Sequence, residues 1–178
     1  MTKIDCADCG APAKIEHNAK YAFRESGLSN VTLKGVGIIH CEECKTHVPI
    51  IPRVNDLMCT LAVALIMKPQ RLRGAEVRFL RKYLNMTQTD FAELIGVDST
   101  HVSKWENDAD NIGPQSDRLI RMMSLQLCPE LKDKFNLHVE MIKAMLKDIK
   151  AEGRTQRVCI HEASGDSDSK TSYQYAYC

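Results

Sequence analysis

Residues 87–106 have the sequence TQTDFAELIGVDSTHVSKWE, which predicts two short helices separated by one glycine. Thr87 and Asp90 have the spacing of a capping box, in which two side chains bond each other's backbone N–H groups at a helix N-terminus. Gly96 favours the left-handed conformation that ends a helix, and Asp98 or Ser99 can cap the helix that follows. The stretch therefore predicts a helix, a sharp turn and a second helix.

The apolar residues of this stretch indicate that the two helices cross closely. The first helix has an apolar face formed by Phe91, Leu94 and Ile95. On the second helix Val102 and Trp105, three positions apart, would pack inward. Ala92 lies where the helices cross, which requires a small side chain. This pattern is that of a helix-turn-helix, in which one helix supports another in the major groove of DNA.

Helical patterns also flank the turn. Residues 73–85, RGAEVRFLRKYLN, predict a preceding helix with an inward stripe of Val77, Leu80 and Leu84. The solvated face of that helix would carry Arg78, Arg81 and Lys82, which either contact DNA phosphates or simply face water. Residues 114–127, PQSDRLIRMMSLQL, predict a following helix whose inward residues are Leu119, Met122, Met123 and Leu127. Four to five helices would close a small all-α core.

The cysteines divide into two matched pairs and four single residues. Each pair has the C-x2-C spacing that aims two sulfurs at one point, and the two pairs are Cys6 with Cys9 and Cys41 with Cys44. Two such turns form a tetrahedral cage for one Zn²⁺ held by four thiolates. Because four thiolates fill the tetrahedron, His40 and His47 are weaker ligand candidates and the zinc would be structural. Buried thiols or a redox dithiol are the alternatives. The single cysteines, Cys59, Cys128, Cys159 and Cys178, follow no pattern.

Composition along the chain predicts five regions. The 31 residues between the cysteine pairs contain short strand patterns, so residues 1–54 are predicted to be a small β-rich zinc module. Residues 55–70 are a predicted linker helix, and residues 71–128 a helix-turn-helix DNA-binding domain. Residues 129–161 are predicted to add a helix, which either packs on its own domain or forms a dimer seam. Residues 162–178 are polar and predict a disordered tail. The stripe of the extra helix is Phe135, Val139, Ile142, Leu146 and Ile149.

The net charge of the chain and the length of its apolar segments exclude several protein classes. The 178 residues carry a net charge of +1, which argues against a polycation that coats DNA without sequence preference. The N-terminus lacks the apolar segment of a secretory signal, and the longest apolar run, residues 57–67, is too short to span a bilayer. We therefore expect a cytoplasmic protein whose cysteines are reduced and which does not bind membranes. The sequence contains no catalytic motif, so an enzyme is not expected.

Two motifs carry a resemblance to known families. The pattern Q-x3-A-x3-G-x5-V-x2-W-E, from Gln88 to Glu106, resembles the phage-repressor (Cro/C1, or XRE) helix-turn-helix family. The cysteine module, with YAFRESGLSNVTLKGV between its pairs, resembles the zinc domain of the MqsA (YgiT-type) antitoxin family. Together the two cover about residues 4–127. The resemblance implies a zinc module joined to a lambda-repressor-like domain in a dimeric repressor that binds a palindromic operator. It also implies an alternative, an antitoxin whose zinc domain neutralises a toxin. The chemistry of the thiolate site leaves a further alternative, a metal- or redox-sensing regulator, because an oxidant can release the metal from such a site.

The second helix of the motif would carry the contacts to double-stranded DNA. Its candidate residues are Ser99, Thr100, His101, Ser103 and Lys104. We expect Thr100, His101 and Lys104 at base edges, where Lys104 can bind guanine O6 or N7, or else a phosphate. Gln88 resembles the family's glutamine that binds the DNA backbone, next to a helix N-terminus that favours phosphate. Members of the MqsA type can carry Asn and Arg where Thr100 and Lys104 stand here, so the operator sequence does not follow from the resemblance.

Overall fold

The computed structural model describes residues 4–128, 131, 143, 146, 147, 149, 150, 156–163 and 172–178. The chain divides into two compact units. The sheet unit comprises Met1–Arg24, Ser29–Leu57 and Arg157–Cys178, and the helical unit comprises Glu25–Leu28 and Met58–Gln156. The N-terminal region is therefore β-rich and the region after it is helical, as the sequence predicts. No helix among the described residues is long and apolar enough to cross a membrane.

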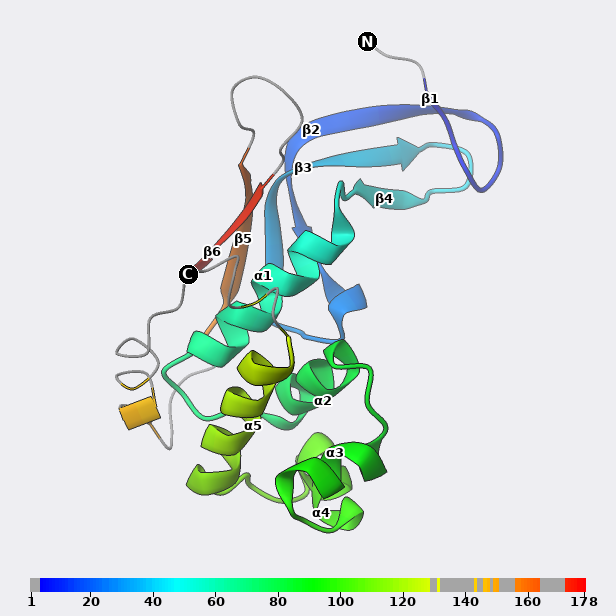
Figure 1. Ribbon diagram of the computed structural model, residues 1–178. Coiled ribbons are helices and arrows are strands. Elements are labelled where there is room, and N and C mark those ends of the chain that lie inside the picture. The colour runs from blue at the N-terminus through cyan, green and yellow to red at the C-terminus, as the bar shows by residue number, and fades with distance from the viewer. Residues whose placement is uncertain are drawn as a thin grey trace. The chain divides into compact units, whose positions relative to one another are not determined.

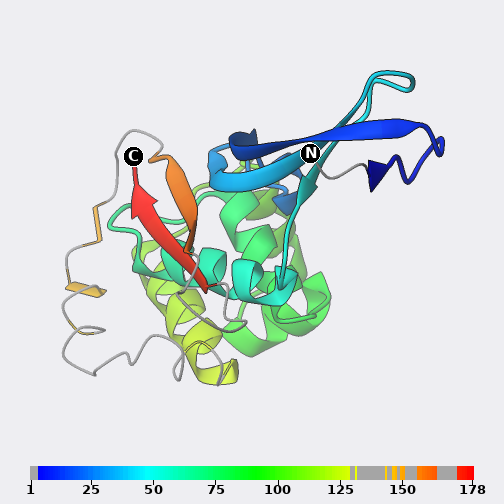
Figure 2. The same ribbon diagram turned by 90° about the horizontal axis from the view of Figure 1, so that it is seen from above.

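Two long antiparallel strands, β2 (Pro12–Ala22) and β3 (Val31–Cys41), form the centre of the sheet unit. The short strand β1 (Ile4–Asp5) pairs with the start of β2, and β4 (His47–Ile50) pairs with the end of β3. Strand β5 (Val158–Ala163) runs parallel to residues 31–34 of β3, and β6 (Ser172–Tyr177) is antiparallel to β5. Figures 1 and 2 show β5 and β6 side by side as the last strands of this sheet.

Bulges adjust which side chains of the long strands face the core. Val31 and Leu33 are buried before Gly35, and Val36 and Ile38 are buried after it, so the alternation shifts by one residue at the glycine. Gly35 has a φ of 83°, a conformation that a side chain disfavours. An extra residue in one strand rotates the following side chains to the opposite face. The bulge at Gly35 therefore lets both apolar pairs of β3 point into one core.

Five α-helices of the helical unit are described over their full length. They are α1 (Val54–Met67, which enters the unit at Met58), α2 (Gly74–Tyr83), α3 (Gln88–Ile95), α4 (Ser99–Glu106) and α5 (Pro114–Leu127). The prediction of a linker helix over residues 55–70 differs from this arrangement, because Leu61, Leu65 and Ile66 of α1 are fully buried. A helix that is apolar on all sides is stable only inside a core, so α1 is a central helix of the unit.

A buried arginine fixes the orientation of α5. The guanidinium of Arg121 is fully buried and donates to the carbonyl oxygens of Ile66, Lys68 and Gln70, each at 2.6 Å. Asp117 accepts a further bond from Arg121 Nε at 3.0 Å and a bond from Leu72 N at 2.7 Å. Arg121 thus satisfies carbonyl groups at and after the end of α1, where a helix leaves them without partners and where a cation is favourable.

The predicted inward face of α5 is wrong. The buried residues are Asp117, Ile120, Arg121, Ser124 and Leu125. Leu119, Met122 and Leu127 are instead 39%, 43% and 42% exposed, and Met123 is half-buried. The apolar pattern predicted that the leucines and methionines of α5 point inward. Sequence alone does not show that carbonyl groups at the end of α1 accept hydrogen bonds from Arg121 and so allow its burial.

The prediction of a disordered tail from residue 162 does not fit β6, and the predicted extra helix does not fit β5. The alternating tyrosines of Ser172–Tyr177 are a strand pattern, and a disulfide joins Cys159 to Cys178 across the two strands. These two cysteines were expected to be reduced, and their pairing depends on strand contacts that spacing does not reveal. Of the predicted apolar stripe, Phe135, Val139 and Ile142 lie outside the described residues.

Gly74 occupies a position with no room for a side chain. A Cβ atom there would lie 2.0 Å from the Trp105 carbonyl oxygen and 2.8 Å from Asp108 Oδ1. We therefore expect Gly74→Ala to destabilise the helical unit by about 1–3 kcal/mol, the usual effect of overpacking, in urea unfolding. Gly113→Ala is the matched control, because no atom lies within 4 Å of the Cβ position at Gly113. Equal stability of the two variants would show that α2 does not pack against the end of α4 in this way.

Candidate metal centre and nucleic-acid interface

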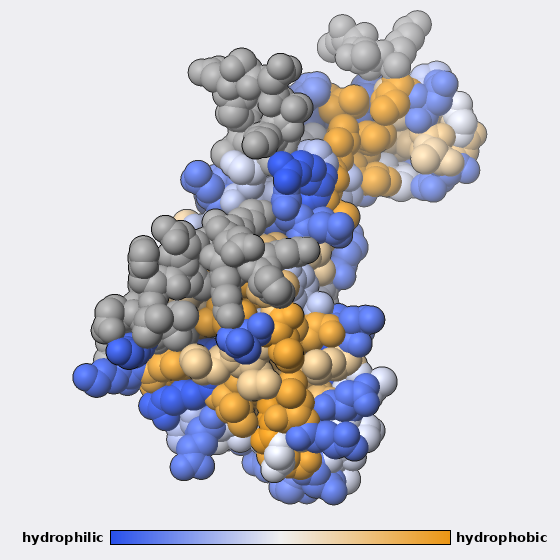
Figure 3. Space-filling view, viewed as in Figure 1, coloured by the Kyte–Doolittle hydropathy of each residue, from blue (hydrophilic) through white to orange (hydrophobic). Residues whose placement is uncertain are grey.

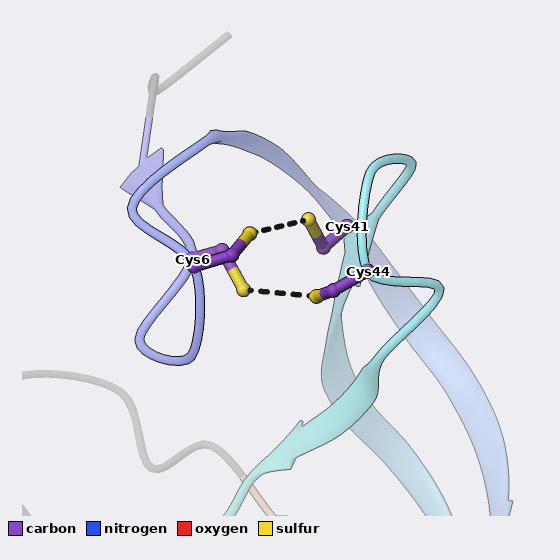
Figure 4. A group of neighbouring side chains, drawn as sticks. Cys6, Cys41 and Cys44 are labelled. Carbon is purple, nitrogen blue, oxygen red and sulfur yellow. Dashed lines mark hydrogen bonds between the residues drawn. The ribbon is translucent and has the colours of Figure 1, made fainter.

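Two tight turns bring the predicted metal ligands together. Gly10, with a φ of 72°, donates to the Cys6 carbonyl oxygen at 2.9 Å and closes the first turn. In the second turn, Cys41 N donates to the Thr46 carbonyl oxygen at 3.1 Å, and Lys45 adopts a φ of 59°. The sulfurs of Cys6 and Cys44 are 3.6 Å apart and those of Cys9 and Cys41 are 3.5 Å apart. Figure 4 shows the labelled Cys6, Cys41 and Cys44 with their sulfurs pointing to a common centre.

The spacing of the four sulfurs fits a tetrahedral ion. All four lie within 4.8 Å of one another, and they form the one such group of metal-binding side chains among the described residues. Four thiolates about 2.3 Å from Zn²⁺ would be about 3.8 Å apart, close to the distances observed. His40 and His47 are not in the group: His40 Nε2 lies 2.9 Å from Glu16 Oε2, and His47 Nδ1 lies 2.9 Å from the Lys45 carbonyl oxygen.

Charge explains why this cluster favours a cation. The Thr46 hydroxyl hydrogen-bonds the sulfur of Cys44 at 3.0 Å and lowers the pKa of that thiol to about 6. The backbone at Ala11 lowers the pKa of Cys9, but hydrogen bonds with the neighbouring thiols, Cys41 first, raise it to about 12. Four sulfurs this close cannot all ionise unless a positive charge lies between them. A divalent ion would supply that charge and deprotonate the thiols.

The predicted turn between α3 and α4 is confirmed. Asp90 N donates to Thr87 Oγ1 at 3.2 Å and Thr87 N donates to Asp90 Oδ2 at 3.3 Å, which completes the capping box. Gly96 ends α3 in the left-handed conformation, with a φ of 70° and a ψ of 38°. Asp98 then caps α4 by accepting a bond from Thr100 N at 2.8 Å. The helix therefore stops at Gly96 and restarts in a new direction.

Helix α4 has one face in the core and one polar face outside it. Val102 and Trp105 are buried, together with Glu106. Thr100, His101 and Lys104 are exposed, while Ser99 and Ser103 are half-buried. The helical repeat of 3.6 residues produces this division, because Val102 and Trp105 share the side that faces α3. The five residues predicted to contact DNA on α4 thus lie outside the buried core, and they include one cation.

Glu106 joins α2, α3 and α4. Its side chain is only 1% exposed and accepts a bond from Arg81 Nε at 2.6 Å and another from Gln88 Nε2 at 2.8 Å. Arg78 Nε is 3.4 Å away, and Arg78 Nη2 also donates to the Glu106 carbonyl oxygen at 2.8 Å. The prediction that Arg81 lies on a solvated face is wrong, because its side chain is 11% exposed. Gln88, the predicted DNA-backbone contact, is half-buried and has one amide proton committed to Glu106.

The comparison with known families agrees with this geometry. A family model described as Helix-turn-helix matches residues 77–124, which run from within α2 to near the end of α5. This part of the chain is an XRE-type helix-turn-helix domain. The match supports DNA binding by this part of the chain, as in regulators of that type. Neither a curated protein nor a solved structure matches the chain.

The buried carboxylate is the feature of the helix-turn-helix domain that the sequence interpretation missed. Burial opposes ionisation of Glu106, but the hydrogen bonds of Arg81 and Gln88 and the charges of Arg81 and Arg78 outweigh it and lower the pKa of Glu106. The available signal was the arginine pair on the preceding helix, at Arg78 and Arg81, together with an acid beside the core Trp105. Two cations and one anion flanking a core residue are consistent with an internal ion-pair network.

Proposed function

We propose that the protein is a dimeric, sequence-specific transcriptional repressor whose sheet unit folds around one structural Zn²⁺. The observation that carries the DNA-binding part is the exposed polar face of α4, which follows the left-handed turn at Gly96. In a helix-turn-helix, side chains on this face enter the major groove. The metal part is supported by the four sulfurs within 4.8 Å of one another.

The proposal assigns different roles to the candidate DNA contacts. Thr100, His101 and Lys104 are the exposed side chains on α4 and would reach base edges. Ser99 and Ser103 are half-buried at the margins of that face, where their hydroxyls would bond DNA backbone. Gln88 begins α3, and an amide group has two N–H donors. Because Glu106 accepts one of them, the other is held in a fixed orientation and would donate to a phosphate.

Lys104→Ala tests the base contact. If the ammonium binds a guanine, its loss should weaken binding by about 1–3 kcal/mol, which is about 5- to 150-fold in Kd. The measurement is a gel-shift titration on a duplex that the wild-type protein selects from a random pool. Lys20→Ala, at an exposed lysine of β2 in the sheet unit, is the matched control for loss of one positive charge. Unchanged affinity of Lys104→Ala would remove this residue from the assignment.

The exposed apolar face of α5 supports the dimer. Leu119, Met122 and Leu127 expose large apolar side chains, and Figure 3 shows apolar surface on the helical unit in the region of α5. Contiguous apolar surface of this kind is typical of protein interfaces. We assign it to a second copy of the chain. A two-fold dimer would then bind a palindromic operator whose half-sites are about 10 base pairs apart.

Met122→Glu is expected to separate the dimer, because a carboxylate would be buried against its own symmetry mate. Sedimentation velocity at micromolar concentration should show a monomer, and operator affinity should fall at least about tenfold. Gln115→Glu is the control, since Gln115 is also exposed on α5 and the change adds the same charge. If Met122→Glu stays dimeric, the interface lies on another surface.

One observation favours a second role as an antitoxin. Strand β4 exposes Val48 and Ile50 by 44% and 38%, and strand edges with apolar side chains are sites where another chain can dock. A toxin protein encoded beside this gene would be the partner. Co-expression with that neighbour should give a complex that Ile50→Glu weakens. If no complex is recovered, the antitoxin role is rejected and the repressor role remains.

The third alternative, a metal- or redox-sensing regulator, is supported by the exposure of Cys9 and Cys44 in the cluster. Oxidants reach exposed thiolates first, and oxidation would release the ion. This role requires that peroxide or a chelator at modest dose lowers operator affinity. Operator binding that persists after the metal has been released would reject it.

A further inference from the structure

The C-terminal hairpin of the sheet unit carries a disulfide that the proposed function does not use. Strands β5 and β6 pair from Val158 with Tyr177 to Ala163 with Ser172, and the bond joins Cys159 of β5 to Cys178, the residue after β6. Cys178 N also donates to the Arg157 carbonyl oxygen at 3.1 Å. The two cysteines therefore close the open end of the hairpin.

The hairpin completes the core of the sheet unit. Val158 lies opposite Val31 and Ile160 opposite Leu33 in the parallel pairing of β5 with β3, and all four side chains are buried. On β6 the ring of Tyr173 is buried, and its hydroxyl donates to the Pro52 carbonyl oxygen. In the described residues β6 pairs with β5 alone, so it is an edge strand of the sheet.

The two cysteines of this bond differ in exposure. Cys159 is 2% exposed, whereas Cys178 belongs to the exposed residues. A thiolate in solution would therefore meet the exposed residue Cys178 before the buried residue Cys159. The remaining six cysteines of the chain belong to no disulfide, and four of them form the metal cluster. The proposed function places the protein with DNA, in a compartment that keeps thiols reduced. Disulfides in such compartments are usually transient or redox-sensing.

We propose that the bond between Cys159 and Cys178 is a reducible clasp, which holds β6 on the sheet when oxidised and releases it when reduced by a cellular dithiol. One thiolate of the dithiol attacks Sγ of Cys178, and Cys159 leaves as a thiolate that takes up a proton. The second thiol of the dithiol then attacks the first sulfur of the same dithiol, which is bonded to Cys178 in the mixed disulfide. This step releases Cys178 as a thiol. The cystine gains two electrons and two protons, and the dithiol becomes a disulfide.

Release follows from the position of the clasp at a sheet edge. Strand β6 pairs with β5 alone, so it depends on that pairing, on the contact of Tyr173 with Pro52 and on the clasp. Without the bond, residues 174–178 can separate and uncover the edge of β5, whose Val158 and Ile160 side chains are buried. The sheet unit therefore has two states: the edge of β5 is covered by β6 when the clasp is oxidised and exposed when it is reduced. This change does not depend on operator binding by α4.

Hydrogen exchange of the full-length, zinc-loaded protein tests the proposal. After equilibration with oxidised glutathione, peptide mapping should find the cross-link, and residues 158–163 and 172–177 should exchange slowly. Dithiothreitol should remove the cross-link and raise exchange in these two segments at least about tenfold, with residues 31–34 less affected. The Cys178→Ser protein should exchange rapidly under both conditions. Cys128→Ser is the matched control, because Cys128 is a free thiol outside the hairpin and should leave the response unchanged.

Two results would overturn the clasp. The proposal is rejected if no cross-link between Cys159 and Cys178 is found after oxidation. It is also rejected if reduction of the cross-link leaves hydrogen exchange in β5 and β6 unchanged. Zinc content is followed in the same samples with a metal-binding dye. If dithiothreitol raises exchange equally in Cys178→Ser and wild-type protein, the effect comes from the metal cluster and not from the clasp.

Discussion

Removal of the metal is expected to unfold the end of the sheet unit that carries the four cysteines. Only Cys6, Ala13 and Cys41 are buried there, with Ile4, Ala11 and Ile39 packed partly against them. Such a small apolar cluster cannot hold two turns and the strand ends beside them, whereas structural zinc contributes about 10–16 kcal/mol in isolated zinc-finger peptides at pH 7. Elemental analysis should find one Zn²⁺ per chain, and a chelator should remove the slow hydrogen exchange of residues 4–16 and 36–50.

Cysteine substitutions separate this effect from nonspecific damage by the chelator. Cys41→Ser should lose the zinc and unfold the same segments, because a serine hydroxyl is a poor ligand in a thiolate site. Cys59→Ser is the matched control, since Cys59 is a buried cysteine of α1 that lies outside the cluster and in no disulfide. Its zinc content should equal that of the wild-type protein. A Cys41→Ser protein that retains stoichiometric zinc would contradict the assignment of the four ligands.

Loss of Glu106 should have the second largest effect. Glu106→Ala leaves the cation of Arg81 with little solvent and without its carboxylate, and removing one partner of a buried ion pair costs about 3–5 kcal/mol. Chemical unfolding followed by tryptophan fluorescence measures this change, because the single Trp105 lies in the same helix. Glu93→Ala on the exposed side of α3 is the control, with an expected change below about 0.5 kcal/mol.

The same carboxylate predicts how stability depends on pH. The pKa of Glu106 is lower in the folded chain than its ordinary value, because Arg81 and Gln88 stabilise the charged form against the effect of burial. Its contribution is therefore complete above the unfolded pKa of about 4.3 and is lost as the pH falls through the folded value. Glu106→Gln should be less stable at pH 7 and should lose less stability than the wild type in acid. Parallel pH profiles would mean that Glu106 is not charged in the fold.

Local signals made the helix-turn-helix and the metal cluster predictable. Thr87, Gly96 and Asp98 act on backbone groups within a few residues of themselves, so their consequences can be derived from sequence alone. The same holds for Cys6 with Cys9 and for Cys41 with Cys44, where a short turn aligns two sulfurs. The joining of the two turns also required the long strands β2 and β3, whereas the sequence predicted short strands between the cysteine pairs.

Long-range partners explain what sequence could not predict. The inward face of α5 depends on Arg121 meeting the carbonyl groups of Ile66, Lys68 and Gln70, which are more than 50 residues away. The burial of Arg81 depends on Glu106, which lies 25 positions along the chain. Strand β5 joins the sheet by parallel pairing with β3, more than 120 residues before it. Hydropathy and residue spacing predict none of these contacts, because each contact joins two segments that are far apart in the sequence.

Selection of duplexes from a random pool tests most directly whether α4 recognises DNA sequence. Wild-type protein should enrich a two-fold symmetric site with half-sites about 10 base pairs apart. The variant Thr100→Ala, His101→Ala, Lys104→Ala should remain folded, because all three side chains are exposed, and should fail to enrich that site. Enrichment of the same site by this triple variant, or of no site by the wild-type protein, would contradict the account.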